Sequence, residues 1–72
     1  MTMRQMAASY RESAGLLYLR MLALQDAQKH ARSRRERSSF EQRYRALKIL
    51  YRETCETALV LERYCDRRDS QP

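Results

Sequence analysis

Apolar residues in the first half of the chain recur at alternating spacings of four and three. The series consists of Met3, Ala7, Tyr10, Ala14, Leu17, Met21 and Leu24, and it continues in the same rhythm through Gln28 and Ala31. Such spacing places one residue per turn on the same helical face, so it predicts a helix with a coiled-coil-like seam. Thr2 precedes the seam and Gln5 follows three residues later, a capping-box pattern. We therefore expect a helix over about residues 2–32.

The second half repeats the same rhythm on a new seam. Its members are Phe40, Tyr44, Leu47, Tyr51, Thr54, Ala58, Leu61 and Cys65. Ser38 lies just before this seam, and Glu41 three residues later completes a second capping-box pattern. The pattern predicts a helix over about residues 39–67, with residues 69–72 frayed at the end.

The segment between the seams, residues 33–38, contains neither Gly nor Pro. If the first helix ran on, its seam would next reach Arg35, Ser38, Gln42 and Arg45, so the apolar stripe would be lost. The stripe instead restarts on a different face at Phe40, which favours a turn near 33–38. We expect an all-α antiparallel helical hairpin that forms one domain over residues 1–72. A single unbroken helix remains the alternative.

Composition narrows the fold class further. The chain has 72 residues, with one Gly, one Pro at its last position and no Asn. Folds rich in β-hairpins and Gly-rich phosphate-binding loops both need more such residues, so we exclude them. A hydrophobic fraction of 43% argues against a disordered chain. The most apolar stretch, residues 14–24, is interrupted by Arg20 and is too short to span a membrane. We therefore expect a cytoplasmic protein.

Many apolar residues fall outside the two seams. A chain this short rarely builds a sufficient core from two helices, and a helix that is apolar nearly all round is normally buried. We therefore expect two hairpins to associate into a four-helix bundle, as a homodimer or a higher homo-oligomer. Docking on another protein remains an alternative. The expected oligomer interface consists of Gly15, Leu16, Leu19, Leu22, Ala23, Leu50, Leu59, Val60 and Tyr64.

The net charge of +6 is concentrated in one part of the chain. Residues 29–52 hold nine basic side chains against Glu36 and Glu41 only. Arg34, Arg35 and Arg37 flank the expected start of the second helix, where cations are disfavoured. Another interaction must therefore compensate their positive charge. Solvation, an acidic protein or membrane surface, or a nucleic acid could supply it. The candidate polyanion-binding residues are Lys29, Arg32, Arg34, Arg35, Arg37, Arg43 and Arg45.

No constellation of catalytic or metal-binding residues is apparent. His30 is the only His, and the acidic residues are scattered. Cys55 and Cys65 lie ten residues apart on one expected helix, about 15 Å, which is too far for a disulfide between them. We expect no enzyme, no cofactor and no metal site. The pattern favours a small interaction or regulatory protein, and a nucleic-acid-binding accessory protein that uses Lys29–Arg52 is the alternative.

Three short segments carry a resemblance to known proteins. They are Met6-Ala7-Ala8-Ser9-Tyr10-Arg11, Ile49-Leu50-Tyr51-Arg52-Glu53-Thr54 and Leu61-Glu62-Arg63-Tyr64. In these segments the chain resembles small two-helix proteins of Firmicutes genomes and their mobile elements. That group has no assigned activity, so the resemblance implies an accessory or regulatory role and carries over no functional residue.

Overall fold

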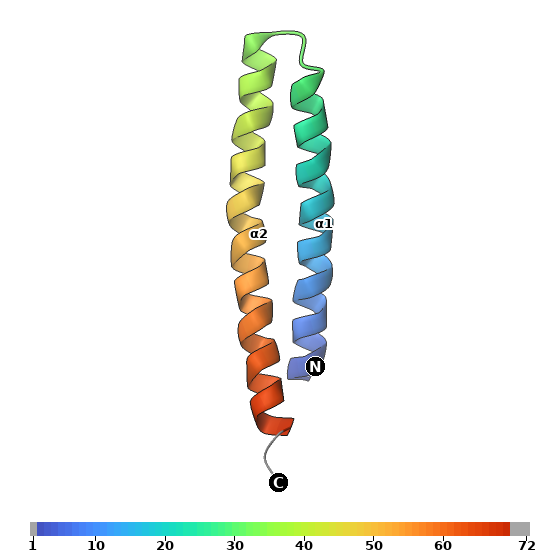
Figure 1. Ribbon diagram of the computed structural model, residues 1–72, viewed down its shortest axis with the longest axis vertical. Coiled ribbons are helices and arrows are strands. Elements are labelled where there is room, and N and C mark those ends of the chain that lie inside the picture. Colours follow the sequence, from blue (N-terminus) through green and yellow to red (C-terminus); the bar gives the residue numbers. More distant parts are fainter. Residues whose placement is uncertain (1, 70–72) are drawn as a thin grey trace.

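The chain folds as two long antiparallel helices that lie side by side (Figure 1). The computed structural model describes residues 2–69, with α1 over Met3–Lys29 and α2 over Arg34–Asp69. The rod measures 60 × 17 × 14 Å. The prediction of an all-α helical hairpin is thus confirmed, and the alternative of one unbroken helix is excluded.

The predicted capping box at the start of α1 is confirmed. The Gln5 backbone N–H donates to Thr2 Oγ1 at 3.1 Å, and the Thr2 backbone N–H donates to Gln5 Oε1 at 2.9 Å. The backbone N–H groups of Thr2 and Gln5 each find a side-chain acceptor in this way. The helix ends at Lys29 rather than at residue 32, and the backbone N–H of His30 donates to the carbonyl oxygen of Ala27.

The turn is shorter and earlier than the sequence predicted. It occupies residues 30–33, so the expected turn near 33–38 and the expected helix start near residue 39 are wrong. Ser33 caps α2, because its Oγ accepts the Glu36 N–H at 3.1 Å and its carbonyl oxygen accepts the Arg37 N–H. The predicted cap, Ser38, lies inside the helix. Of the segment expected to fray, Asp69 belongs to α2, and residues 70–72 lie outside the described residues.

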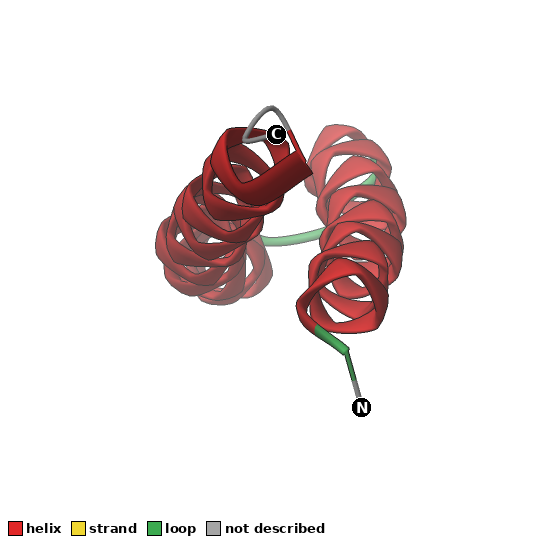
Figure 2. Cartoon of the chain, turned by 90° about the horizontal axis from the view of Figure 1, so that it is seen from below, coloured by secondary structure: helices red, strands yellow, loops and turns green. Residues whose placement is uncertain are grey.

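The two seams face each other, as their spacing predicted. Every seam position from Met3 to Cys65 is buried or half-buried except Tyr10, whose exposed fraction is 38%. Seen along the rod, the two helices pack only on each other (Figure 2). Within the described residues the buried side chains are Ala7, Ala14, Met21 and Ala58. Three of these four are alanines, so the core is a thin line that lets the helices approach closely.

Candidate interaction surfaces

The hairpin leaves large apolar side chains on its surface. The exposed fractions reach 59% for Leu16, 61% for Leu19 and 63% for Val60. All nine residues of the expected oligomer interface are exposed, including the small residues Gly15 and Ala23. Scattered single apolar residues are normal on a protein surface, so only exposed apolar residues that lie close together indicate an interaction surface.

One group lines a groove between the two helices. It consists of Tyr10, Ser13, Leu16, Leu17 and Arg20 from α1, with Leu50 and Thr54 from α2. The Thr54 hydroxyl donates to the Leu50 carbonyl oxygen at 2.7 Å, so this polar group is already satisfied within α2. The residues that line the groove include no acidic side chain. The structure thus brings Leu16 and Leu50 of the expected interface together across the helix pair, and we call this surface the apolar groove.

The other members of the expected interface lie on different sides of the rod. Leu19 and Ala23 each follow a seam residue by two positions, which turns them about 200° away from α2. Gly15 lines a hollow on the other side of the helix pair, and Val60 lines one on α2 with Glu53 and Glu56. The nine residues therefore surround the rod and do not form a single patch. Leu22, Leu59 and Tyr64 are exposed by 43%, 40% and 48%.

The hollow beside Gly15 contains two aromatic rings and a thiol. Tyr18 and Tyr51 pack with their ring centroids 5.9 Å apart and their planes inclined by 40°. The pKa of Tyr51 is raised above its ordinary value, first by a hydrogen bond with the Cys55 thiol. Arg11 lines the same hollow and joins α1 to Glu62 of α2. The ring contact between Tyr18 and Tyr51 and the ion pair of Arg11 hold the two helices together on this side of the seam.

The ion pair between Arg11 and Glu62 was not predicted from the sequence. Arg11 follows the seam residue Tyr10, and Glu62 follows the seam residue Leu61. Positions that flank a seam are where charged residues of two helices meet, so this placement was the available signal. Because Arg11 donates hydrogen bonds to it, the pKa of Glu62 lies below its ordinary value.

The basic side chains gather at the turn end of the rod. The seven candidate polyanion-binding residues are all exposed. Few acidic groups balance their charge there. Glu41 compensates Arg45, to which it is bonded at 2.6 Å, and Asp26 lies 3.8 Å from the His30 ring. Lys29 and Arg37 line one hollow together with Gln25 and Gln28, so α1 and α2 both contribute to this end.

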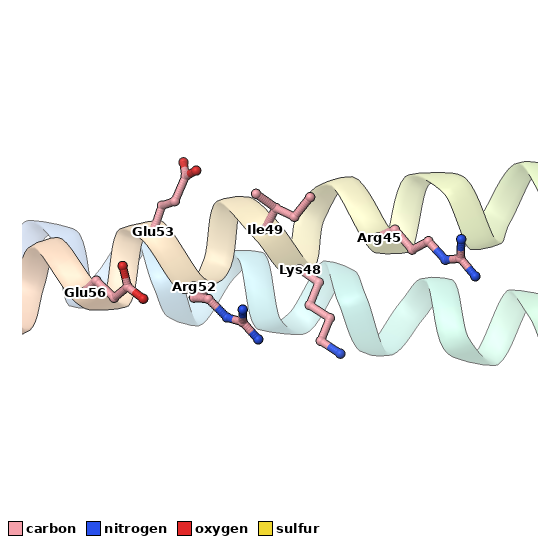
Figure 3. Close-up of a pocket in the computed structure, with 6 residues that line it drawn as sticks. All are labelled: Arg45, Lys48, Ile49, Arg52, Glu53 and Glu56. Atoms are coloured by element: carbon pink, nitrogen blue, oxygen red, sulfur yellow. The ribbon is translucent and has the colours of Figure 1, made fainter.

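A second part of the basic segment lies along the outer side of α2. Arg45, Lys48 and Arg52 line a shallow hollow together with Ile49, Glu53 and Glu56. The three basic side chains extend to the same side of the helix, whereas Glu53 extends the other way (Figure 3). Positive and negative groups thus occupy successive stretches of one helix, and the positive stretch faces the turn.

The described residues gather no cluster of metal-ligating side chains. Within residues 2–69 there is no group of three or more His, Cys, Asp or Glu side chains that could hold a metal ion. Neither helix, as far as it is described, is long and apolar enough to cross a membrane. No protein-family model matches the chain, and no curated protein or solved structure matches it.

Proposed function

We propose that this chain is a non-enzymatic interaction or regulatory protein that acts as a homo-oligomeric helical bundle. The observation that carries the proposal is the imbalance between core and surface. Among the described residues four side chains are buried, while Leu16 and Leu50, which line one groove, are exposed by 59% and 48%. Burial of such side chains in a second copy would add the hydrophobic stabilisation that the hairpin itself lacks.

The total surface supports the same conclusion. The hairpin exposes 6184 Å², whereas a compact monomer of this mass exposes about 4,700 Å². A standard protein interface buries about 800 Å² of each partner, so the excess of roughly 1,500 Å² per chain is more than one such interface would cover. Two rods packed side by side would remove part of this excess, because they form a thicker body from the same chains.

The apolar groove is the surface that we assign to the second copy. Leu16, Leu17 and Leu50 offer the same apolar contacts from both copies, as a two-fold interface requires. An antiparallel arrangement also suits the charge distribution, since residues 29–52 are strongly basic and residues 53–72 carry more acidic than basic groups. A different protein with an apolar helix face is the alternative occupant. We further propose a cytoplasmic location, where the free thiols of Cys55 and Cys65 would stay reduced.

Sedimentation equilibrium of the purified chain tests the proposal. We expect a dimer or a larger species at micromolar concentration, and the double variant Leu16→Gln/Leu50→Gln should shift it toward the monomer. Ile49→Gln is the matched control, because Ile49 is 62% exposed but lies outside the groove. A stable folded wild-type monomer at micromolar concentration would overturn the proposal. Equal loss of association in the control would place the interface elsewhere.

A further inference from the structure

The basic residues of α2 form an ordered row along one side of the helix. Arg34 and Arg37 begin the row, and Arg45, Lys48 and Arg52 continue it. Steps of three or four residues keep side chains on one helical face, and Glu41 fills the only gap in this spacing. Eighteen residues of helix, about 27 Å, separate Arg34 from Arg52. We call these five basic residues the basic stripe.

The contacts along the row leave most of its charge uncompensated. Glu41 neutralises Arg45, but no ion pair is found for Arg34, Arg37, Lys48 or Arg52 within residues 2–69. Lys29 of α1 lies beside Arg37 in the hollow at the turn end and extends the row onto the second helix. At the other end, Glu53 and Glu56 mark where the basic stripe stops.

A second copy of the chain can supply only a small part of the missing negative charge. Residues 53–72 carry five acidic against three basic residues, an excess of only two, whereas residues 29–52 carry a basic excess of seven. One of those acidic residues, Glu62, is already engaged by Arg11. A partner with densely and regularly spaced negative charge would supply it, and the phosphate backbone of a nucleic acid has this property.

The shape of the stripe distinguishes a nucleic acid from a membrane surface. A helix that lies on a membrane inserts an apolar face next to its basic residues. The only apolar side chain in the hollow that Arg45, Lys48 and Arg52 line is Ile49, so no such insertion face accompanies the stripe. A narrow row of cations along a straight rod instead fits a linear polyanion.

We propose that the basic stripe binds the phosphate backbone of nucleic acid without reading its sequence. Side chains that contact phosphate alone position a protein on nucleic acid and carry no base information. The stripe does not overlap the apolar groove, since none of its five residues lines that groove. Nucleic-acid binding is therefore independent of the self-association proposed above, and each can fail without the other.

Fluorescence anisotropy with a labelled 30-base-pair DNA duplex of arbitrary sequence tests this proposal. Four phosphate contacts, one for each basic residue of the stripe without an ion pair, give a slope of about −3 to −4 in a plot of log K against log salt concentration, and two fewer contacts make it shallower by about 2. We expect this change for the double variant Arg37→Gln/Lys48→Gln. Arg4→Gln/Arg63→Gln is the matched control, because it removes the same charge from exposed positions outside both the stripe and the apolar groove and should leave the slope nearly unchanged.

Further binding measurements identify the ligand. A single strand of 30 nucleotides shows whether the stripe needs a duplex, and a scrambled duplex should bind equally well. Circular dichroism and sedimentation of Arg37→Gln/Lys48→Gln should match the wild type, which separates lost binding from lost structure. The proposal is overturned by absence of binding at about 50 mM salt, by equal loss in both double variants, or by binding to vesicles with phosphatidylserine but not to DNA.

Discussion

Arg11 and Glu62 form an ion pair with two-point geometry across the two helices, although 51 positions separate them in the sequence. Arg11 Nε donates to Glu62 Oε1 at 3.0 Å and to Oε2 at 3.2 Å, and the terminal guanidinium nitrogen adds a further contact. Such a planar pairing fixes the relative rotation of two helices more tightly than a single contact between charges. The pair therefore joins the two helices at the end away from the turn.

Replacement of the acidic partner should change how stability depends on pH. The hydrogen bonds from Arg11 lower the pKa of Glu62 in the folded chain, so the pair stabilises the fold above the ordinary carboxyl pKa of about 4.3. That contribution is lost as the pH falls through the lowered pKa. We expect Glu62→Gln to lower the thermal midpoint at pH 7, with the difference from wild type vanishing toward pH 3. Thermal melts across this range measure it.

Glu53→Gln is the control for this experiment, since Glu53 is exposed and has no ion-pair partner within the described residues. A difference between wild type and Glu62→Gln that stays constant down to pH 3 would contradict the role assigned to the ion pair.

Enlargement of a core alanine should force the helices apart. Ala58 is fully buried at the contact between α1 and α2. Overpacking of a close contact typically costs about 1–3 kcal/mol, so Ala58→Leu should destabilise the hairpin by that amount. Ala46→Leu introduces the same side chain at an exposed position of the same helix and should have little effect. Urea denaturation at one fixed protein concentration compares them, and equal stabilities would argue against close packing at Ala58.

Gly15 offers a test with two separate readouts. A Cβ atom added there would meet nothing within 4 Å in the hairpin. Gly15→Ala should therefore stabilise the fold by up to about 1 kcal/mol, because Ala restricts the unfolded chain and favours helix. Denaturation at low concentration measures this gain, and a loss of stability would refute it. Sedimentation of the same variant should match the wild type, because Gly15 lies outside the apolar groove, and weaker association would place a second copy on the side of Gly15 instead.

The two candidate caps of α2 can be separated directly. Ser33→Ala removes the hydroxyl that accepts the Glu36 N–H and should cost about 1 kcal/mol. Ser38→Ala changes a residue within the helix and should be neutral or slightly stabilising. Urea denaturation ranks the two variants, and the reverse order would favour a helix start near Ser38.

The sequence was sufficient to predict the helix contact because that contact follows from periodicity. A spacing of four and three can bury only one stripe per helix, so the burial of positions such as Ala14 and Ala58 follows from the spacing alone. The Thr2 cap was equally predictable, since Gln5 lies at the required spacing and an apolar run follows at once.

The start of α2 was mispredicted because two capping patterns compete within six residues. Ser33 with Glu36 has the same spacing as Ser38 with Glu41, and the seam favoured the later one. A seam reports where apolar contact begins, whereas a helix begins where its first N–H groups find acceptors. Arg34, Arg35 and Arg37 are good helix formers, so the helix extends back beyond its first contact at Phe40.

The surfaces were less predictable than the seam. Exposed residues obey no periodic constraint, so the sequence could name Leu16 and Val60 as apolar but could not tell that they lie in different hollows. The pairing of Arg11 with Glu62 depends on the register between helices, which the turn sets. A shift of the turn by a few residues moves every such pair, while the seam itself remains unchanged.

The early start of α2 leaves a helical segment with little tertiary support. Residues 34–39 are helical and exposed, and the first half-buried residue of α2 is Phe40. Apart from the hollow that Arg37 shares with α1, the backbone hydrogen bonds of these residues depend on the Ser33 cap and local helix propensity. Amide hydrogens there should exchange with solvent faster than those around Ala58. Phosphate bound as proposed above would slow this exchange, and Arg34 and Arg37 would then couple the local opening of the helix end to occupancy of the basic stripe.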